Sequence, residues 1–329
     1  MKFATLKNGH RDGSLVLVSR DLNSAVSLID HVPTMQCLME TWAQWEAPLE
    51  ALYQDLNDGN CQQAFAFDSS LVMAPLPRSY QWCDASAFLN HGELLQKAFN
   101  LPPQAEMETI PLMYQGAADD FLGARDDIRL PTEDHNIDFE GEFAVMVDDV
   151  PMGCSSTDAA QHIKLILLLN DVSLRGFIQR EIQAGFGFLQ AKPSTSFAPV
   201  AVTPDELVDG WRNERVCLPL NIEWNAEWFG SANGEEMNFS FADLIAHAAL
   251  TRKLGAGTIV GSGTVSNRDT RKGSSCIAER RALDMIQEGK PKTPFMSFGD
   301  RIRMEACLPD GGSVFGAIDQ YIVQENVNV

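Results

Sequence analysis

Apolar and polar positions alternate differently in the two parts of the chain. Apolar runs at residues 3–6 and 14–19 flank a polar turn and predict two strands, and a helical region rich in Leu, Met and Trp follows. Pro75 and Pro77 then favour an extended passage. We therefore expect a small N-terminal domain at residues 1–76 and a larger domain at residues 77–329.

The larger domain is predicted to be rich in β-strands. Its apolar runs are short and are broken by Gly, Pro, Asn and Asp. One clear helix is expected from about Phe241 to Leu254, because Ser240 and Asp243 have the spacing of a capping box and Gly255 suits a helix end. The fold class is thus mixed α+β and β-rich.

The C-terminal third ends in a predicted hairpin. Two alternating runs, at residues 302–307 and 314–318, are separated by the turn sequence Pro-Asp-Gly-Gly at residues 309–312. We therefore expect two antiparallel strands there.

Acidic residues cluster in the run from residue 137 to residue 147. A period of two predicts that Asp138, Glu140 and Glu142 share one face of a strand. Neighbouring carboxylates repel unless water or a cation neutralises them, and a hard divalent cation prefers such oxygen ligands. Taken alone, the pattern favours a solvated sheet face over a metal site, because charged residues are mostly exposed.

A second acidic position follows a buried strand. The run His162-Ile-Lys-Leu-Ile-Leu-Leu-Leu-Asn-Asp171 delivers the Asp171 carboxylate at its C-terminal end. Asp171 could bind a cation there or cap a helix that starts near Val172, since aspartate is a preferred capping residue. The pattern alone does not decide between cation binding and helix capping.

Two basic positions are candidates for chemistry. Lys192 is the only cation in a stretch of apolar and small residues, where it could neutralise a substrate carboxylate or a developing enolate. A surface lysine with a buried stem fits the same pattern. His91, seven residues after Asp84, could serve as a general base, but the residue pattern does not favour it over the other histidines.

The glycine-rich segment at residues 255–266 does not have the spacing of a phosphate-binding loop. It contains neither G-x-G-x-x-G nor G-x-x-x-x-G-K-[ST], and a predicted helix precedes it where a strand is required. The glycines are expected to let the backbone approach a ligand, with Thr264 available to form a hydrogen bond.

Composition narrows the classes of partner. The 45 acidic and 25 basic residues give a formal net charge of -20, which disfavours nucleic-acid and membrane partners because both are anionic. The seven cysteines include no C-x-x-C pair, which argues against a disulfide framework or a zinc site and favours buried thiols. No apolar leader or membrane-length run is visible, so we expect a cytoplasmic protein.

Four motifs occur in a fixed order: Glu-Gly-Glu at 140–142, Asn-Asp-Val-Ser-Leu-Arg at 170–175, Gly-Phe-Leu-Gln-Ala-Lys at 187–192 and Gly-Ser-Gly-Thr-Val-Ser at 261–266. Together they resemble the fumarylacetoacetate hydrolase family, in its long-chain bacterial type, from about residue 76 to the end. The resemblance implies a small N-terminal domain, a large mixed β-roll or sandwich catalytic domain, and a homodimer.

The resemblance also implies the residues of an active site. Four positions match the family's metal-binding carboxylates: Asp84, Glu140, Glu142 and Asp171. His91 matches the catalytic base, and Glu279 matches the glutamate that orients it. Four further positions match substrate-facing residues: Tyr114, Arg175, Lys192 and Thr264. The implied ion is Mg²⁺ or Ca²⁺, with Mn²⁺ as a third choice.

The function implied is hydrolysis of a carbon–carbon bond in a small anionic 1,3-diketo acid, foremost fumarylacetoacetate in tyrosine catabolism. Two departures from the family pattern concern substrate recognition: Ser86 replaces an expected tyrosine, and Gln179 matches a family glutamine only with one inserted residue. The alternatives are acylpyruvate hydrolysis, oxaloacetate decarboxylation or an isomerisation by the same family, and a non-catalytic protein that binds Ca²⁺.

Overall fold

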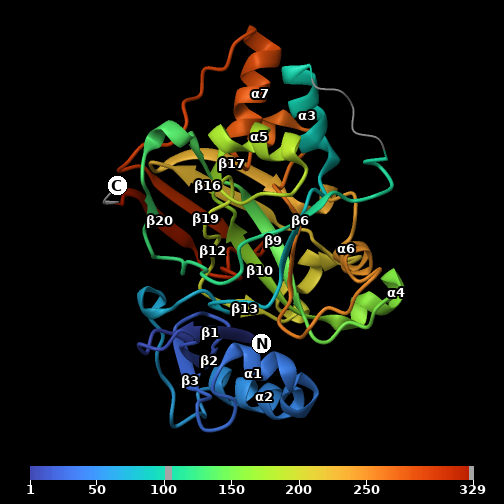
Figure 1. Ribbon diagram of the computed structural model, residues 1–329. Coiled ribbons are helices and arrows are strands. Elements are labelled where there is room, and N and C mark those ends of the chain that lie inside the picture. The colour runs from blue at the N-terminus through green and yellow to red at the C-terminus, as the bar shows by residue number, and fades with distance from the viewer. Residues whose placement is uncertain (101–105, 326–329) are drawn as a thin grey trace.

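The first part of the chain forms a small sheet covered on one side by two helices. In the computed structural model, which describes residues 1–100 and 106–325, this unit lies at one end of the molecule (Figure 1). Its elements are β1 (Lys2–Leu6), β2 (Ser14–Val18), β3 (Ser24–Ser27), α1 (Met35–Glu40), α2 (Trp42–Asn57) and β4 (Phe65–Ala66). The predicted strand pair is confirmed, because β1 and β2 are antiparallel neighbours.

Beyond this unit, the described residues up to 325 form many short strands and five α-helices. In chain order these are β5 (Trp82–Ala85), α3 (Leu89–Phe99), β6 (Met113–Gln115), β7 (Ile128–Leu130), β8 (Ile137–Asp138), β9 (Gly141–Val147), α4 (Ser156–Ala159), β10 (Ile163–Asn170), β11 (Ser173–Leu174), α5 (Arg175–Ala184), β12 (Ser196–Phe197), β13 (Ala201–Val202), β14 (Trp211–Arg212), β15 (Arg215–Val216), β16 (Pro219–Trp224), β17 (Glu227–Asn233), α6 (Phe241–Ala248), β18 (Ile259–Gly261), α7 (Ile277–Glu288), β19 (Arg301–Ala306) and β20 (Ile318–Gln324). The mixed, β-rich fold class is confirmed.

One large sheet contains strands from both parts of the chain. Its strand order is β4-β3-β2-β1-β13-β10-β9-β18-β5-β6, with β12 also paired to β10. Because β1 pairs antiparallel with β13, the N-terminal strands extend the sheet of the larger domain. The domain boundary near residue 76 stays a prediction.

A second sheet, in the order β17-β16-β19-β20-β7, packs against the first. Phe143 and Val145 of β9 share one hydrophobic core with Ile222 of β16, whereas Ala144 and Met146 face the other core together with Phe3 and its neighbours. Strands β9 and β10 are therefore buried on both faces. This double burial explains the continuous apolar run at residues 163–169.

Helix α6 begins as predicted but ends earlier. Ser240 and Asp243 form the expected capping box, yet the helix stops at Ala248 instead of Leu254. The reason is that the backbones of Val150 and Leu254 exchange hydrogen bonds of 2.8 and 3.1 Å, which hold the chain at Leu254 in an extended bridge.

Two predicted strands also differ from the structure. Strands β19 and β20 form the expected antiparallel pair, but β20 starts at Ile318, after a short bridge between Cys307 and Ser313. The run at residues 137–147 is divided into β8 and β9, with Phe139 and Glu140 between them. The period of two therefore does not continue across residues 139 and 140.

Candidate active site

Three carboxylates converge where neighbouring strands of the large sheet meet. Leu169 of β10 pairs with Glu142 of β9, which brings Asp171 close to Glu142. The adjacent strand β18 pairs Gly261 with Asp84 of β5. Carboxylate oxygens of Asp84, Glu142 and Asp171 all lie within 4.8 Å of one another. The predicted convergence of these residues is thus present in the structure.

The three carboxylates are buried. Asp84 is 4% exposed, and Glu142 and Asp171 are fully buried, so the alternative of a solvated sheet face is wrong. Both carboxylate oxygens of Glu142 lack a hydrogen-bond partner among the described residues. Burial and the charges of Asp84 and Asp171 raise the pKa of Glu142 well above its ordinary value. A buried carboxylate without donors is costly, and a cation would remove that cost.

The donor set fits a hard divalent cation. The group consists only of carboxylate oxygens, which Mg²⁺, Ca²⁺ and Mn²⁺ prefer over nitrogen and sulfur donors. Asp84 is further positioned by the Gly263 N–H, which donates to its Oδ1 at 3.1 Å. Gly261 leaves room for the same side chain, because a Cβ there would lie 2.4 Å from Asp84 Oδ1. The glycine-rich segment therefore cradles a candidate metal ligand.

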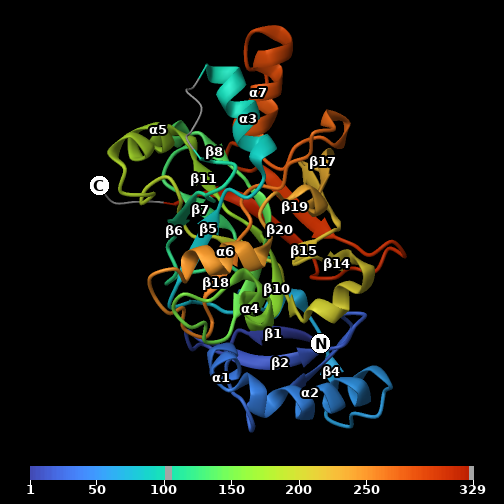
Figure 2. The same cartoon turned by 90° about the vertical axis from the view of Figure 1, so that its right-hand side faces the viewer.

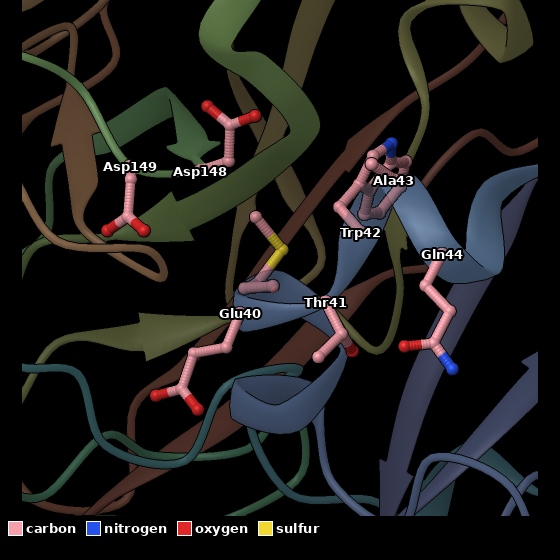
Figure 3. A pocket seen from close by; sticks show the side chains of 8 residues that line it. Glu40, Thr41, Trp42, Ala43, Gln44, Asp148 and Asp149 are labelled. Carbon is pink, nitrogen blue, oxygen red and sulfur yellow. The ribbon is translucent and has the colours of Figure 1, made fainter.

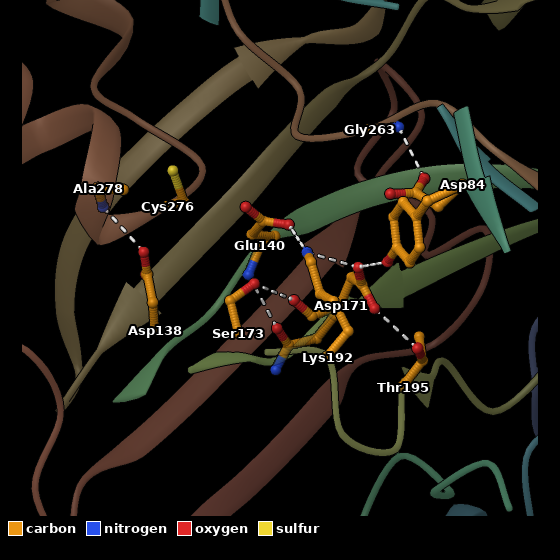
Figure 4. A network of polar contacts seen from close by, with 12 residues as sticks. Asp84, Asp138, Glu140, Asp171, Ser173, Lys192, Thr195, Gly263, Cys276 and Ala278 are labelled. Atoms are coloured by element: carbon orange, nitrogen blue, oxygen red, sulfur yellow. Dashed lines mark hydrogen bonds and ion pairs between the residues drawn. The ribbon is translucent and has the colours of Figure 1, made fainter. Parts of the chain in front are cut away.

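Asp171 does not cap a helix. Helix α5 follows it but starts at Arg175, after strand β11, and its N-cap is Leu174. The Asp171 carboxylate instead accepts hydrogen bonds from the hydroxyls of Tyr114, at 2.6 Å, and Thr195, at 2.8 Å (Figure 4). Tyr114 lies opposite Asp84 in the pairing of β5 with β6. The capping alternative is wrong.

Lys192 lies inside the site. Its side chain is 6% exposed, and its Nζ forms ion pairs with Glu140 and, at 2.7 Å, with Asp171 Oδ2 (Figure 4). Burial opposes the charge of Lys192, but Asp171 and Glu140 outweigh it and raise the pKa of the ammonium. The alternative of a surface lysine is wrong.

Glu140 is held by two cations. Arg175 donates from Nη2 to Glu140 Oε1 at 2.6 Å, and Lys192 donates to Oε2. Burial alone would raise the pKa of Glu140, but the charges of Lys192 and Arg175 hold it below its ordinary value. Glu140 therefore remains a carboxylate, and its role as a fourth metal ligand stays a prediction.

His91 and Glu279 are in contact. His91 lies in the first turn of α3 and Glu279 in the first turn of α7, two helices that lie side by side (Figures 1 and 2). His91 Nδ1 is 3.0 Å from Glu279 Oε2, and the two side chains are 12% and 2% exposed. Because Glu279 can accept the Nδ1 proton, the other ring nitrogen is left free to accept one.

The remaining predicted positions lie in different surroundings, and their contact with a substrate stays a prediction. Tyr114 is half-buried beside Asp171 and packs edge-on against Phe188, and Thr264 is buried in the segment after β18. Arg175 is engaged with Asp138 and Glu140. Gln179, which departed from the family pattern, is exposed on α5.

Asp138, which the sequence pattern placed on one strand face with Glu140 and Glu142, has a structural role instead. It is fully buried, and its carboxylate accepts hydrogen bonds from the backbone of Ile277, at 2.7 Å, and Ala278, at 2.9 Å, at the start of α7. It also accepts from Arg175 Nε at 2.7 Å. Asp138 therefore links the helix that carries Glu279 to the arginine that holds Glu140.

Replacing Asp138 with asparagine should destabilise the fold by about 3 kcal/mol. The change leaves the partly buried Arg175 with only one carboxylate and turns an amide group toward backbone donors. Urea unfolding measures the change. The matched control is Asp134→Asn at an exposed position, which should change stability by less than about 0.5 kcal/mol. An Asp138→Asn protein as stable as this control would contradict the structural role.

The metal-free protein should become less stable as the pH rises from about 4 to about 8. Burial and the charge of Asp171 raise the pKa of Asp84 from 3.8 to about 8. Between these values the folded protein holds a proton that the unfolded chain has released, so raising the pH favours unfolding. Thermal unfolding in chelator measures the trend, and Asp84→Asn should flatten it.

Added Mg²⁺ should stabilise the protein more at pH 8 than at pH 5, because Mg²⁺ binding displaces the Asp84 proton. A melting temperature that rises over this window without metal would contradict the assignment.

Comparisons with known families agree with this arrangement. The family model described as fumarylacetoacetate (FAA) hydrolase C-terminal matches residues 81–323. The chain belongs to the fumarylacetoacetate hydrolase family. A second model, fumarylacetoacetase N-terminal domain 2, matches residues 1–78.

The curated relatives have several activities. The chain is 28% identical over 171 residues to the human mitochondrial oxaloacetate tautomerase FAHD2B, a match that covers 51% of each chain. It is 29% identical over 168 residues to 2,4-didehydro-3-deoxy-L-rhamnonate hydrolase of Sphingomonas sp., covering 50% of this chain and 55% of that one. The chain spans about half the length of these curated relatives, so their names leave the substrate open.

Solved structures share the whole fold. Maleylpyruvate hydrolase from Sphingobium sp. SYK-6, in complex with manganese(II) ion and pyruvate, superposes with a TM-score of 0.66 at 16% identity, covering 99% of this chain and 100% of that one. Fumarylacetoacetate hydrolase from Exiguobacterium antarcticum gives a TM-score of 0.64 at 15% identity with the same coverage. At these identities the likeness shows the fold alone.

Other features of this family member lie apart from the carboxylates. A hollow beside α1 and α2 is lined by Met39, Glu40, Thr41, Trp42, Ala43, Gln44, Asp148 and Asp149, none of them a predicted site residue (Figure 3).

All seven cysteines are free thiols. The prediction that they are buried is correct for Cys83, Cys154 and Cys276, whereas the other four are partly exposed. Within residues 1–100 and 106–325, no helix is long and apolar enough to cross a membrane.

Proposed function

We propose that this protein hydrolyses a carbon–carbon bond in a 1,3-diketo acid with the help of a divalent cation, and that its substrate is fumarylacetoacetate, an intermediate of tyrosine breakdown. The observation that carries the proposal is the contact between His91 and Glu279. His91 has a ring nitrogen within 4.8 Å of a Glu140 oxygen, and Lys192 joins Glu140 to Asp171 of the buried carboxylates. Hydrolysis needs a positioned base for water, and the contact provides one. Tautomerisation or decarboxylation needs no attacking water.

A bound cation would be held by Asp84, Glu142 and Asp171, with Glu140 as the predicted fourth ligand, and would polarise the oxygens of the keto acid. Mg²⁺, Ca²⁺ and Mn²⁺ all suit these donors. The Mn²⁺ and pyruvate in the maleylpyruvate hydrolase structure support a cation and a small keto acid as ligands here.

The residues of the chain supply the proton transfers. Glu279 holds the Nδ1 proton of His91, so the other ring nitrogen takes a proton from water as the water oxygen bonds to the carbonyl carbon. The carbon–carbon bond then breaks and its electron pair becomes an enolate. His91 returns the proton to the enolate carbon. The newly formed carboxylic acid loses its proton to solvent, so fumarylacetoacetate and one water give fumarate, acetoacetate and one proton.

Lys192 is suited to stabilise the enolate oxygen. Its ammonium has three N–H donors, and it forms ion pairs with two carboxylates, those of Glu140 and Asp171. The third donor can meet the oxygen on which charge develops, in a buried site where such a contact is strong. Tyr114 and Thr264 are assigned to substrate contacts, whereas Arg175 is assigned to holding Glu140 in place.

A spectrophotometric screen tests the proposal. Fumarylacetoacetate, an acylpyruvate and the enol form of oxaloacetate are each added to protein loaded with Mg²⁺, Mn²⁺ or Ca²⁺. Loss of the conjugated diketone absorbance with fumarylacetoacetate, dependent on the cation, is the expected result. Turnover of the oxaloacetate enol alone would overturn hydrolysis of a diketo acid.

A second candidate is keto–enol isomerisation or decarboxylation of oxaloacetate, which the similarity to oxaloacetate tautomerases favours. Both reactions use the same carboxylates and enolate chemistry. Decarboxylation needs no attacking water, so it should survive loss of His91, whereas isomerisation still needs a group that moves a proton. A non-catalytic Ca²⁺-binding protein, the third candidate, predicts no turnover of any keto acid. Formation of a homodimer stays a prediction from the family resemblance.

A further inference from the structure

Helix α5 is connected to both cations that pair with Glu140. Arg175 is the first residue of α5 and donates to Glu140 from there. After the helix ends, the chain returns through residues 185–191 to Lys192, the second cation on Glu140. The position of the Lys192 ammonium therefore depends on how this return segment is held.

The side chain of Glu181, on α5, holds the return segment to the helix. Within the described residues, the backbone at 186–190 forms no hydrogen bond to other backbone groups. The Glu181 carboxylate instead accepts three consecutive backbone N–H groups, those of Leu189 at 3.0 Å, Gln190 at 2.9 Å and Ala191 at 3.1 Å. The last of these residues directly precedes Lys192.

Burial distinguishes this carboxylate from a surface contact. Glu181 is 8% exposed, whereas Phe186 and Leu189 of the return segment are 99% and 84% exposed. Burial opposes the charge of Glu181, but the three backbone N–H groups hold the pKa of its carboxyl below the ordinary value. Because hydrogen bonds to a charged acceptor are stronger than those between neutral groups, Glu181 anchors an otherwise exposed segment.

Ala191 transmits this anchoring to the site. It is fully buried, its N–H donates to Glu181, and its C=O accepts from the N–H of Leu174 at 2.8 Å. The backbone is thus fixed on both sides immediately before Lys192. Phe188, in the same segment, packs edge-on against Tyr114, so the anchor also holds the neighbour of a second predicted site residue.

We propose that Glu181 is a positioning residue of the active site, which holds Lys192 where its ammonium meets the oxygen that gains charge. Glu181 acts through Lys192, because its own carboxylate is occupied by the three backbone N–H groups. The inference rests on the proposed role of Lys192 in enolate stabilisation, which the alternative reactions of the site share. The anchoring of the return segment does not depend on that role.

Replacing Glu181 with glutamine should lower kcat by about 10- to 100-fold and change KM by less than about threefold. Glutamine keeps the shape of the side chain, but its amide group turns N–H donors toward backbone donors. A displaced Lys192 weakens a contact that is strongest in the transition state, so the loss falls on kcat. Kinetics of Mg²⁺-saturated protein with fumarylacetoacetate measures both constants. Wild-type kcat, or a loss confined to KM, would overturn the proposal.

Asp284→Asn is the matched control. Asp284, on α7, accepts the backbone N–H groups of Lys292 at 2.9 Å and Thr293 at 2.8 Å, so it anchors the chain after its own helix in the same way. That chain leads to no predicted site residue, and Asp284→Asn should retain kcat within about twofold. Equal losses of kcat in the two variants would contradict a positioning role for Glu181.

A double-mutant cycle with Lys192→Ala tests whether Glu181 acts through Lys192. Adding Glu181→Gln to Lys192→Ala should lower kcat by less than about threefold, because the group that Glu181 positions is already gone. A further loss as large as the one that Glu181→Gln causes alone would show that Glu181 acts by another route.

Hydrogen exchange followed by mass spectrometry tests the anchor without reference to turnover. The backbone amides of residues 189–191 should be protected in the wild type and exchange at least about 10-fold faster in Glu181→Gln, but not in Asp284→Asn. Wild-type amides that exchange as fast as those of an unfolded chain would refute the anchor, even if no variant folds. Failure of the proposed hydrolysis would appear separately, as normal protection without turnover of diketo acids.

Discussion

Replacing His91 with alanine should lower kcat for fumarylacetoacetate by about 10²- to 10⁴-fold, the range that a positioned general base contributes. The reason is that the His91 ring, held at 3.0 Å by Glu279, is the group placed to take a proton from water. Affinity for Mg²⁺ should change little, because His91 is not one of the three converging carboxylates. Steady-state kinetics with metal-saturated protein measures the effect.

The structure offers a matched control for this variant. His162 also pairs through Nδ1 with a carboxylate, Asp148 at 2.6 Å, but on the far end of β9 and β10 from the site. His162→Ala should retain kcat within about twofold. Wild-type turnover by the His91→Ala protein with Mg²⁺ bound would show that the general-base role is wrong.

Replacing Glu142 with glutamine should lower affinity for a divalent cation by at least about 100-fold and remove turnover with it. The change keeps the shape of the side chain but removes a charged ligand from the buried group. The metal-free variant should be no less stable than the metal-free wild type. Among the described residues, the Glu142 carboxylate has no hydrogen-bond partner that the substitution could remove. Replacing this charged group with a neutral amide also removes its electrostatic repulsion with Asp84 and Asp171.

Calorimetric titration with Mg²⁺ and Mn²⁺ measures the affinity, and thermal unfolding in chelator measures the stability. Glu235→Gln, at an exposed position, serves as the control and should change neither. An unchanged cation affinity in Glu142→Gln would contradict the metal assignment. A large loss of stability in the metal-free variant would instead give Glu142 a structural role.

Much of the site could be predicted from strand ends and ordered motifs. Asp171 follows a strand whose apolar run is easily recognised, and pairing of that strand with β9 brings it to Glu142. The pattern could not decide whether these carboxylates are solvated or buried, because that depends on the N-terminal unit covering β9 and β10 from the second side.

Other parts of the site carry no local signal. The chain between β8 and β9 breaks the period of two, so Asp138 pairs with Arg175 and the start of α7 instead of joining Glu142. Glu279 lies far along the chain from His91, and the two residues meet only because α3 and α7 pack together. Such contacts between distant segments follow from sheet topology and helix packing, which residue spacing does not encode. For the same reason the end of α6 depends on the bridge to Val150.

Product analysis tests the central proposal most directly. Fumarylacetoacetate is incubated with protein saturated with Mg²⁺ and, in parallel, with protein kept in chelator, and the products are separated and quantified. The proposed mechanism predicts equal amounts of fumarate and acetoacetate, formed only when the cation is present. Consumption of the substrate without cleavage, or no cation-dependent product at all, would contradict it.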